Sequence, residues 1–189
     1  MKEAKLYRII RPIVVFITKV FIRPKFIGLE NIPKEKRVIL AGIHTSIMDP
    51  LLLITATKRS IHFLSKDELW HGPKKILFAN LGLIPVNRRI KDHNALETAI
   101  KYLESDMVIG IFPEGTTEKG RGLLPFKIGA VKMASDTNTR IIPFVITGKY
   151  RLFSRNLKII FLPPFKVKSK ELASENDRLR ETIKKMMEV

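Results

Sequence analysis

The sequence predicts a single α/β domain in which helices flank a mixed, largely parallel sheet. Two observations predict it. Short apolar runs alternate along the chain with longer segments of helical period, as in strands joined by crossover helices. The chain also has 189 residues, 45% of them hydrophobic, which is enough for one core, and no linker divides it.

The first expected helix covers residues 4–24, and we expect it to break or kink near Pro12. One apolar stripe recurs at the helical period: Leu6, Ile9, Ile10, Ile13, Val14, Ile17, Val20 and Phe21. Basic residues interrupt or flank this stripe. The pattern fits a helix lying in a membrane interface, and it also fits a helix packed on the protein core.

The uncharged stretch from Pro12 to Thr18 is far shorter than the roughly 20 apolar residues that span a bilayer, so we expect no spanning helix and no secretory signal here. We therefore expect an N-terminal amphipathic, membrane-docking segment (1–28) followed by the α/β domain (29–189).

Six apolar runs are expected to form strands: 38–41, 61–64, 84–86, 107–112, 141–146 and 157–162. The run at 84–86 is weakened by Pro85, because proline cannot donate to the ladder of a sheet. Pro143 leaves three interpretations for 141–146, namely an edge strand, the wall of a site, or plain core. The helices are expected at 50–58, 73–81, 92–104, 127–135 and 170–187.

The charge of the chain indicates an anionic partner. Lys and Arg number 35 against 18 Asp and Glu, a formal net charge of +17. Such a surface attracts nucleic acid, anionic lipid headgroups or an acidic carrier protein. There is no cysteine, which excludes disulfides, thiolate zinc sites and cysteine nucleophiles. The four histidines lack zinc-type spacing, so we expect neither a metal nor a cofactor.

A His-x-x-x-x-Asp pattern, His44 to Asp49, comes just after the first expected strand. Loops at strand ends are where α/β folds place their sites. Histidine can take a proton near neutral pH, and a carboxylate on its other ring nitrogen fixes the tautomer. Alternatively, Asp49 caps a helix that has Pro50 at its first position, and His44 is a loop histidine with a hydrogen-bond partner.

Three further features carry polar groups at the ends of expected elements. Arg88 ends the run at 84–86 and can bind phosphate with its planar fork, or it is a solvated strand end. The turn 112–116 closes the strand at 107–112; it exposes Glu114 and Thr116 to a ligand, or it is an ordinary strand-ending turn. Lys127 precedes a helix, where it adds charge to an anion site or is simply solvated.

The order and spacing of these blocks resemble the glycerolipid acyltransferase family, and most of all the bacterial 1-acyl-glycerol-3-phosphate acyltransferases. The matching blocks are His44 to Asp49, Gly82 to Arg88, Phe112-Pro113-Glu114-Gly115-Thr116, and Ile141-Ile142-Pro143. Two positions depart from the family pattern. Ile43 stands where the family often has Asn, and Thr117 where it usually has Arg, so that a replacement would have to come from Lys119 or Arg121.

The resemblance implies a role for each matching residue. His44 would be the general base and Asp49 its orienting partner. Arg88 would bind the acceptor phosphate, with Glu114, Gly115, Thr116 and Lys127 completing the pocket for the glycerol phosphate. Because no Gly-x-Ser-x-Gly pattern surrounds Ser46, direct attack by the acceptor hydroxyl is favoured over an acyl-serine. Backbone N–H groups near the His44 turn are the expected oxyanion donors.

The partners implied are lysophosphatidic acid, acyl-CoA or acyl carrier protein as donor, and an anionic membrane surface, at the cytoplasmic face of the cell membrane. Another glycerol phosphate or lysophospholipid acceptor would use the same motifs. The rival from another class is a basic nucleic-acid-binding domain, but no nucleic-acid motif is visible and we expect no specific nucleic acid. A membrane-surface protein without activity and a thioester hydrolase are the remaining alternatives.

Overall fold

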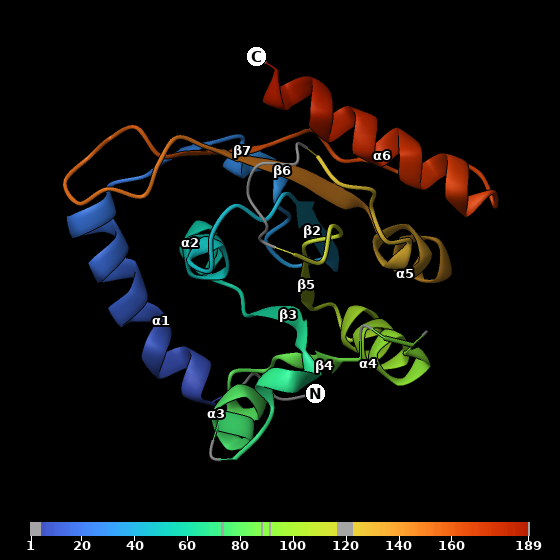
Figure 1. Cartoon of the computed structure of the whole chain (residues 1–189), viewed down its shortest axis with the longest axis horizontal. Helices are drawn as coiled ribbons and strands as arrows, with labels where there is room; N and C mark the ends of the chain where they lie inside the picture. Colours follow the sequence, from blue (N-terminus) through green and yellow to red (C-terminus); the bar gives the residue numbers. More distant parts are fainter. Residues whose placement is uncertain (1–4, 73, 88, 91, 117–122, 189) are drawn as a thin grey trace.

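The computed structural model describes residues 5–72, 74–87, 89–90, 92–116 and 123–188. Within these residues the strands form one sheet in the order β1-β7-β6-β2-β5-β3-β4 (Figure 1). The strands are β1 (Lys25–Ile27), β2 (Val38–Gly42), β3 (Ile61–Lys66), β4 (Ile84–Val86), β5 (Val108–Ile111), β6 (Ile141–Thr147) and β7 (Lys158–Phe161). The helices are α1 (Lys5–Ile17), α2 (Asp49–Ala56), α3 (Lys74–Asn80), α4 (His93–Glu104), α5 (Gly129–Thr137) and α6 (Leu172–Met187), with short helical turns η1 (Thr18–Ile22), η2 (Leu29–Asn31) and η3 (Asp67–Leu69).

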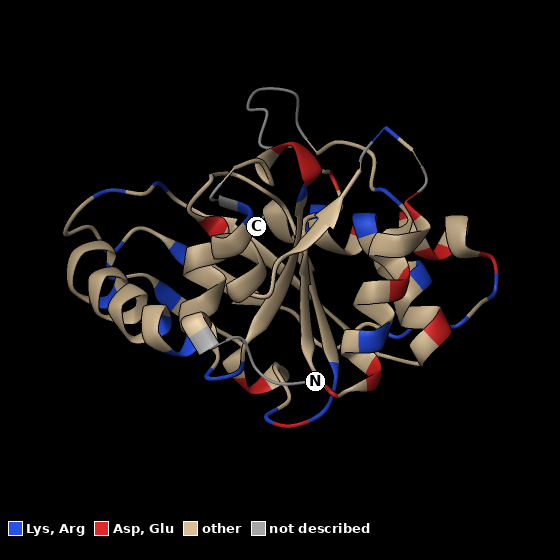
Figure 2. Cartoon of the chain, turned by 90° about the horizontal axis from the view of Figure 1, so that it is seen from below, with Lys and Arg blue, Asp and Glu red and all other residues tan. Residues whose placement is uncertain are grey.

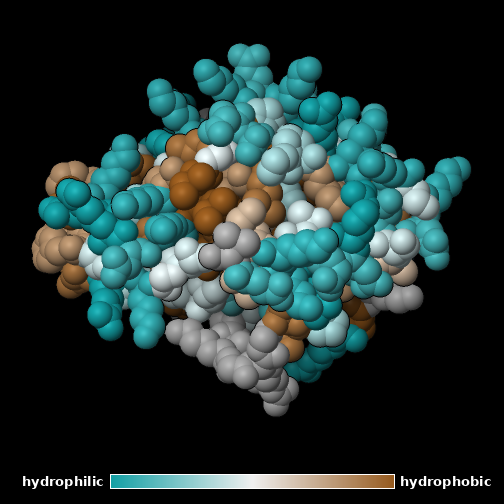
Figure 3. All heavy atoms as spheres, turned by 90° about the horizontal axis from the view of Figure 1, so that it is seen from above, coloured by the Kyte–Doolittle hydropathy of each residue, from teal (hydrophilic) through white to brown (hydrophobic). Residues whose placement is uncertain are grey.

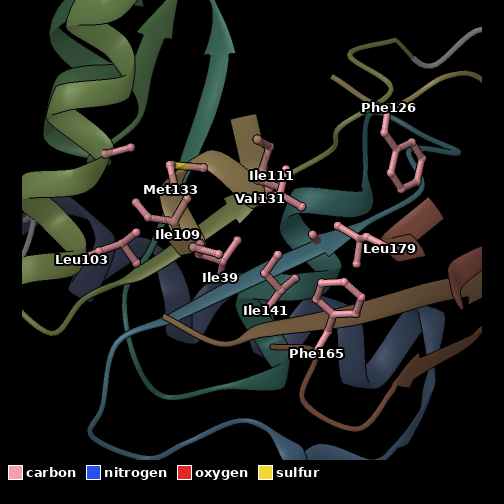
Figure 4. Close-up of a cluster of buried hydrophobic side chains, with 14 of the residues drawn as sticks. Ile39, Leu103, Ile109, Ile111, Phe126, Val131, Met133, Ile141, Phe165 and Leu179 are labelled. Carbon is pink, nitrogen blue, oxygen red and sulfur yellow. The ribbon is translucent and has the colours of Figure 1, made fainter. Parts of the chain in front are cut away.

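One face of the sheet is covered by α4, α5 and α6. Alternate residues of a strand point to opposite faces, so Ile39 and Ala41 of β2 reach this side while Val38 and Leu40 reach the other. Figure 4 shows the packing of strand residues against α4, α5 and α6, with side chains that include Ile39, Ile109, Leu103, Met133 and Leu179.

The other face is covered by α2, and α1 lies outside α2 as a further layer (Figure 2). Leu52 and Leu53 of α2 are almost fully buried in the core on this side of the sheet. The predicted α/β class is therefore confirmed, with helices on both faces of a mostly parallel sheet.

The central strand β2 pairs in parallel with both β5 and β6. Parallel strands end at the same edge of a sheet, so the loops that follow β2, β5 and β6 meet there. On the far side of β6, β7 is antiparallel, and β1 pairs in parallel with β7. No prediction covered β1; its three residues form no apolar run, and their pairing with β7 defines the strand.

The two strand prolines have different surroundings. Pro85 lies in β4, an edge strand that pairs only with β3 in the described sheet, as expected for a residue without an N–H donor. Pro143 lies in β6 between β7 and β2, and its neighbours in the strand are buried. Of the three interpretations of 141–146, the edge is therefore wrong and the core is correct.

Helix α1 continues through Pro12 instead of breaking there, and a π-helical turn, η1, follows it. The side of α1 that faces the protein carries Tyr7 and Arg11. The Tyr7 hydroxyl donates to Arg59 O at 3.3 Å, and the Arg11 guanidinium donates to Thr57 O at 2.7 and 3.0 Å.

Leu6, Ile10, Val14 and Val20 of the predicted apolar stripe are partly buried. The rest of the stripe faces outward: Ile9 (64% exposed), Ile13 (55%), Ile17 (47%) and Phe21 (36%), beside Phe16 (63%), which the predicted stripe did not include. The interpretation that the stripe packs on the protein core is therefore wrong for these exposed side chains. None of the helices that the structure describes has both the length and the apolar character needed to cross a bilayer.

Candidate functional site

The site begins at the turn that joins β2 to α2. His44 Nδ1 lies 3.0 Å from Asp49 Oδ2, and the same oxygen accepts hydrogen bonds from Thr45 N at 2.6 Å and Ser46 N at 2.8 Å. The Asp49 side chain is fully buried, whereas that of His44 is 17% exposed. A buried carboxylate needs such donors, because burial without partners would strongly destabilise its charge. The imidazole is thus fixed by Asp49 and still partly open to solvent.

Asp49 is not the N-cap of α2. The cap position belongs to Met48, and Asp49 is the first residue of the helix, ahead of Pro50. Its carboxylate turns back towards residues 44–46 rather than bonding the first N–H groups of α2. The capping alternative is therefore wrong, and the carboxylate instead organises the histidine turn.

Tyr150 completes the surroundings of this carboxylate from a distant part of the chain. Its hydroxyl donates to Asp49 Oδ1 at 2.6 Å, and Thr45 Oγ1 is 3.3 Å from the same oxygen. Burial, the hydrogen bond to Asp49 and the charge of Asp49 all raise the pKa of Tyr150 well above its ordinary range. The hydroxyl therefore keeps its proton and remains a donor to the carboxylate.

The turn after β5 lies against the histidine. The rings of His44 and Phe112 stack with centroids 4.0 Å apart and an interplanar angle of 16°. Glu114 accepts a hydrogen bond from His44 N at 3.4 Å on Oε1, and one from Leu124 N at 3.2 Å on Oε2. Its carboxylate therefore joins the loop after β2 to the segment that leads into α5.

Gly115 and Lys127 are also brought together at this turn. Gly115 has φ +71°, in the left-handed region that favours glycine. A Cβ atom at this position would lie 3.3 Å from Lys127 Cε and 3.6 Å from Nζ, so the lysine side chain crosses directly over the glycine. Lys127 N also donates to Pro113 O at 2.9 Å. The turn that bonds the His44 backbone through Glu114 therefore also carries an exposed cation, Lys127.

The expected oxyanion donors are not available in the first part of the histidine turn. The N–H of His44 donates to Glu114, and those of Thr45 and Ser46 donate to Asp49. This expectation is wrong for residues 44–46, because their backbone N–H groups already donate to the carboxylates of Glu114 and Asp49.

Some sequence predictions cannot be placed. Arg88 lies outside the described residues, as do Thr117, Lys119 and Arg121. Thr116 directly follows Gly115 and is partly buried. Within the described ranges, no three His, Asp or Glu side chains gather as they would around a metal ion.

The model of the Acyltransferase family matches residues 23–147. The chain belongs to this acyltransferase family.

Similar proteins include 1-acyl-sn-glycerol-3-phosphate acyltransferases from several bacteria. That of Borreliella burgdorferi is 40% identical over 133 residues, covering 69% of this chain and 53% of the relative. That of Haemophilus influenzae is 33% identical over 134 residues, covering 67% and 56%. The chain thus spans about half the length of these two relatives. That of Bacillus subtilis is 28% identical over 178 residues, covering 86% and 87%.

The crystal structure of the 1-acyl-sn-glycerophosphate acyltransferase PlsC from Thermotoga maritima matches with a TM-score of 0.76 and 22% identity, covering 99% of this chain and 82% of that one. This likeness shows that the two chains share the same fold.

Sequence reasoning missed two members of the site, Tyr150 and the stacking role of Phe112. Tyr150 lies three residues beyond the segment matched by the family model. A signal was nevertheless present, since Tyr150 follows a buried strand parallel to the one that precedes His44. Once β2, β5 and β6 are known to be neighbours, polar and aromatic residues after each of them belong to one edge.

Proposed function

We propose that this chain transfers a fatty acyl group from a thioester, acyl-CoA or acyl carrier protein, to the free sn-2 hydroxyl of 1-acyl-glycerol 3-phosphate, which yields phosphatidic acid. The observation that carries the proposal is the 3.0 Å approach of His44 Nδ1 to the buried carboxylate of Asp49. The names of the relatives support the choice of acceptor.

In the proposed reaction, His44 is the general base. With Nδ1–H donating to Asp49, Nε2 takes the proton of the acceptor hydroxyl as that oxygen attacks the thioester carbonyl. A C–O bond forms, the tetrahedral intermediate collapses, the C–S bond breaks, and the proton passes from Nε2 to the departing thiolate. The charge of Asp49 stabilises the imidazolium formed between these two steps.

The acceptor phosphate is proposed to bind beside the turn after β5. Lys127 supports this because its side chain crosses Gly115, next to the His44 turn. Glu114 would help to hold the glycerol phosphate as well as join two loops, and Thr116 would contribute from the same turn. Arg88 is proposed as the second phosphate ligand, on the basis of the sequence resemblance alone.

The acceptor is a membrane lipid, so the enzyme must reach a bilayer. We propose that α1 docks on the anionic cytoplasmic face of the cell membrane through its outward apolar side. Neither α1 nor η1 contains an acidic residue. Arg8 and Lys19 are exposed on them, and so is Arg23 directly after η1, which suits anionic headgroups (Figure 2).

The proposal is tested by an acyl-transfer assay with purified protein. Acyl-CoA and acyl carrier protein are each offered with 1-acyl-glycerol 3-phosphate, glycerol 3-phosphate and other lysophospholipids. We expect turnover with 1-acyl-glycerol 3-phosphate, and a loss of about 10² to 10⁴ in kcat for His44→Ala, the usual contribution of a general base. Asp49→Asn is the companion variant, because an amide of the same shape keeps the side chain in place.

The alternatives give different results. A thioester hydrolase would release free fatty acid at a rate that is independent of the acceptor. A membrane-surface protein or a nucleic-acid-binding domain would show no turnover. Equal turnover by wild type and His44→Ala would refute the proposed mechanism.

A further inference from the structure

The loop between β6 and β7, residues 148–157, combines exposed apolar side chains with positive charge. Leu152 is 67% exposed and Phe153 is 59% exposed. The loop has three basic residues, Lys149, Arg151 and Arg155, and no acidic one. Side chains this large and this apolar are not usually left together in water, and flanking cations are typical of surfaces that meet anionic lipid.

The backbone of this loop holds the apolar side chains outward. Phe153 has φ +56°, a left-handed conformation that is unfavourable by about 1–2 kcal/mol for a residue with a side chain. The N–H of Phe153 donates to Phe21 O at 2.5 Å, and its ring lies 5.7 Å from that of Phe21. The guanidinium carbon of Arg23 lies over the ring of Phe153, 5.6 Å from its centroid. A strained residue that its surroundings maintain points to a function for the loop.

The contact with Phe21 joins the loop to the outward side of α1 and η1. Figure 1 shows the loop beside the C-terminal end of α1, and Figure 3 shows hydrophobic side chains at that end of the molecule. Leu152 and Phe153 therefore extend the surface formed by Ile9, Ile13, Phe16, Ile17 and Phe21. We call these seven side chains the outer apolar surface.

We propose that the 148–157 loop is a second lipid-contact element, which inserts Leu152 and Phe153 among the headgroups of an anionic phospholipid bilayer while Arg151 and Arg155 bind the phosphates. The inference rests on the proposed docking of α1, which it extends to a part of the chain more than 100 residues away. We favour an anionic bilayer as the partner of this surface, because the loop and α1 carry exposed apolar side chains and basic residues but no Asp or Glu.

The same loop reaches the catalytic pair. Tyr150, two residues before Leu152, donates to Asp49 Oδ1 at 2.6 Å. Lipid contact at residues 152 and 153 therefore fixes the loop against the bilayer at a point next to the site, where the acceptor hydroxyl must arrive.

The first experiment measures binding to vesicles of phosphatidylglycerol and phosphatidylcholine by co-sedimentation. For Leu152→Ser/Phe153→Ser we expect binding at least about tenfold weaker, from the transfer of two large apolar side chains. Arg151→Gln and Arg155→Gln should each weaken binding about fivefold, and only with anionic vesicles at low salt. Met187→Ser is the matched control, since Met187 is 40% exposed on α6, across the sheet from α1, and should bind like wild type.

The second experiment locates the loop directly and does not depend on turnover or on the stability of the serine variant. Leu152→Trp is made in a Trp70→Phe background, because Trp70 is the one tryptophan of the chain. Lipids brominated near the headgroup should quench the introduced indole when the protein binds vesicles. Binding to vesicles without quenching would overturn the proposal, as would wild-type binding by Leu152→Ser/Phe153→Ser. Failure of the proposed acyl transfer would appear in the activity assay and would leave both of these measurements unaffected.

Discussion

Tyr150→Phe removes only the hydroxyl that donates to the buried Asp49 carboxylate. The bond is short, 2.6 Å, and its acceptor is charged and fully buried. Loss of such a bond costs about 1.5–3 kcal/mol, and the 3.3 Å contact with Thr45 Oγ1 offers a weaker substitute. We expect the free energy of unfolding to fall by that amount. If half of it acts through the position of Asp49, kcat falls about three- to tenfold, because 1.4 kcal/mol corresponds to a factor of ten.

The assay measures kcat and KM for the acceptor at a temperature where the variant is folded, together with urea unfolding. Tyr102→Phe is the matched control, because Tyr102 lies on α4 and stacks on His62 at 4.1 Å, away from the site. A positioning role predicts a lower kcat with an unchanged KM in Tyr150→Phe alone. Equal kcat values for Tyr150→Phe, Tyr102→Phe and wild type would refute the reasoning, even if stability falls.

Two further predictions concern stability. The raised pKa of Tyr150 keeps its proton bound in the folded state above the ordinary value of 10.0, where the unfolded chain releases it. The free energy of unfolding of wild type should therefore fall above pH 10 by up to about 1.4 kcal/mol per pH unit more than that of Tyr150→Phe; parallel curves would contradict this. Gly115→Ala and Gly72→Ala should each lower the free energy of unfolding in urea by about 1 kcal/mol, because both glycines have a positive φ. Only Gly115→Ala should also raise the KM for the acceptor, through Lys127, and an equal rise in Gly72→Ala would argue against that contact.

Most of the fold could be predicted because its strands are short apolar runs with buried side chains. The run at 38–41 became β2, and that at 141–146 became β6. The ends of helices were less predictable where hydrogen bonds to other parts of the chain decide them. Helix α5 begins at Gly129 and not at Lys127, whose N–H bonds to Pro113 instead.

The pairing of His44 with Asp49 could be predicted because they are five positions apart in the sequence, so a local turn is enough. The contribution of Tyr150 could not, because 101 residues separate it from Asp49 and only the pairing of β6 with β2 brings them together. The sequence also could not predict that the exposed apolar side chains of α1 face outward. Periodicity shows that a helix has two sides, but it does not show which side carries the bonds from Tyr7 and Arg11 to the protein.

The stacking of the His44 ring on Phe112 bears on the order in which the two substrates of the proposed reaction bind and leave. Asp49 holds Nδ1 of the imidazole, and Phe112 covers one face of its ring at a centroid distance of 4.0 Å, so the ring is held in one orientation. In direct attack no acyl-enzyme stores the acyl group, and the fixed nitrogen that takes the proton from the hydroxyl also delivers it to sulfur, so donor and acceptor have to be bound at once around Nε2. Initial-rate plots at varied concentrations of both substrates should then give intersecting lines, as a ternary complex requires, rather than the parallel lines of a ping-pong enzyme.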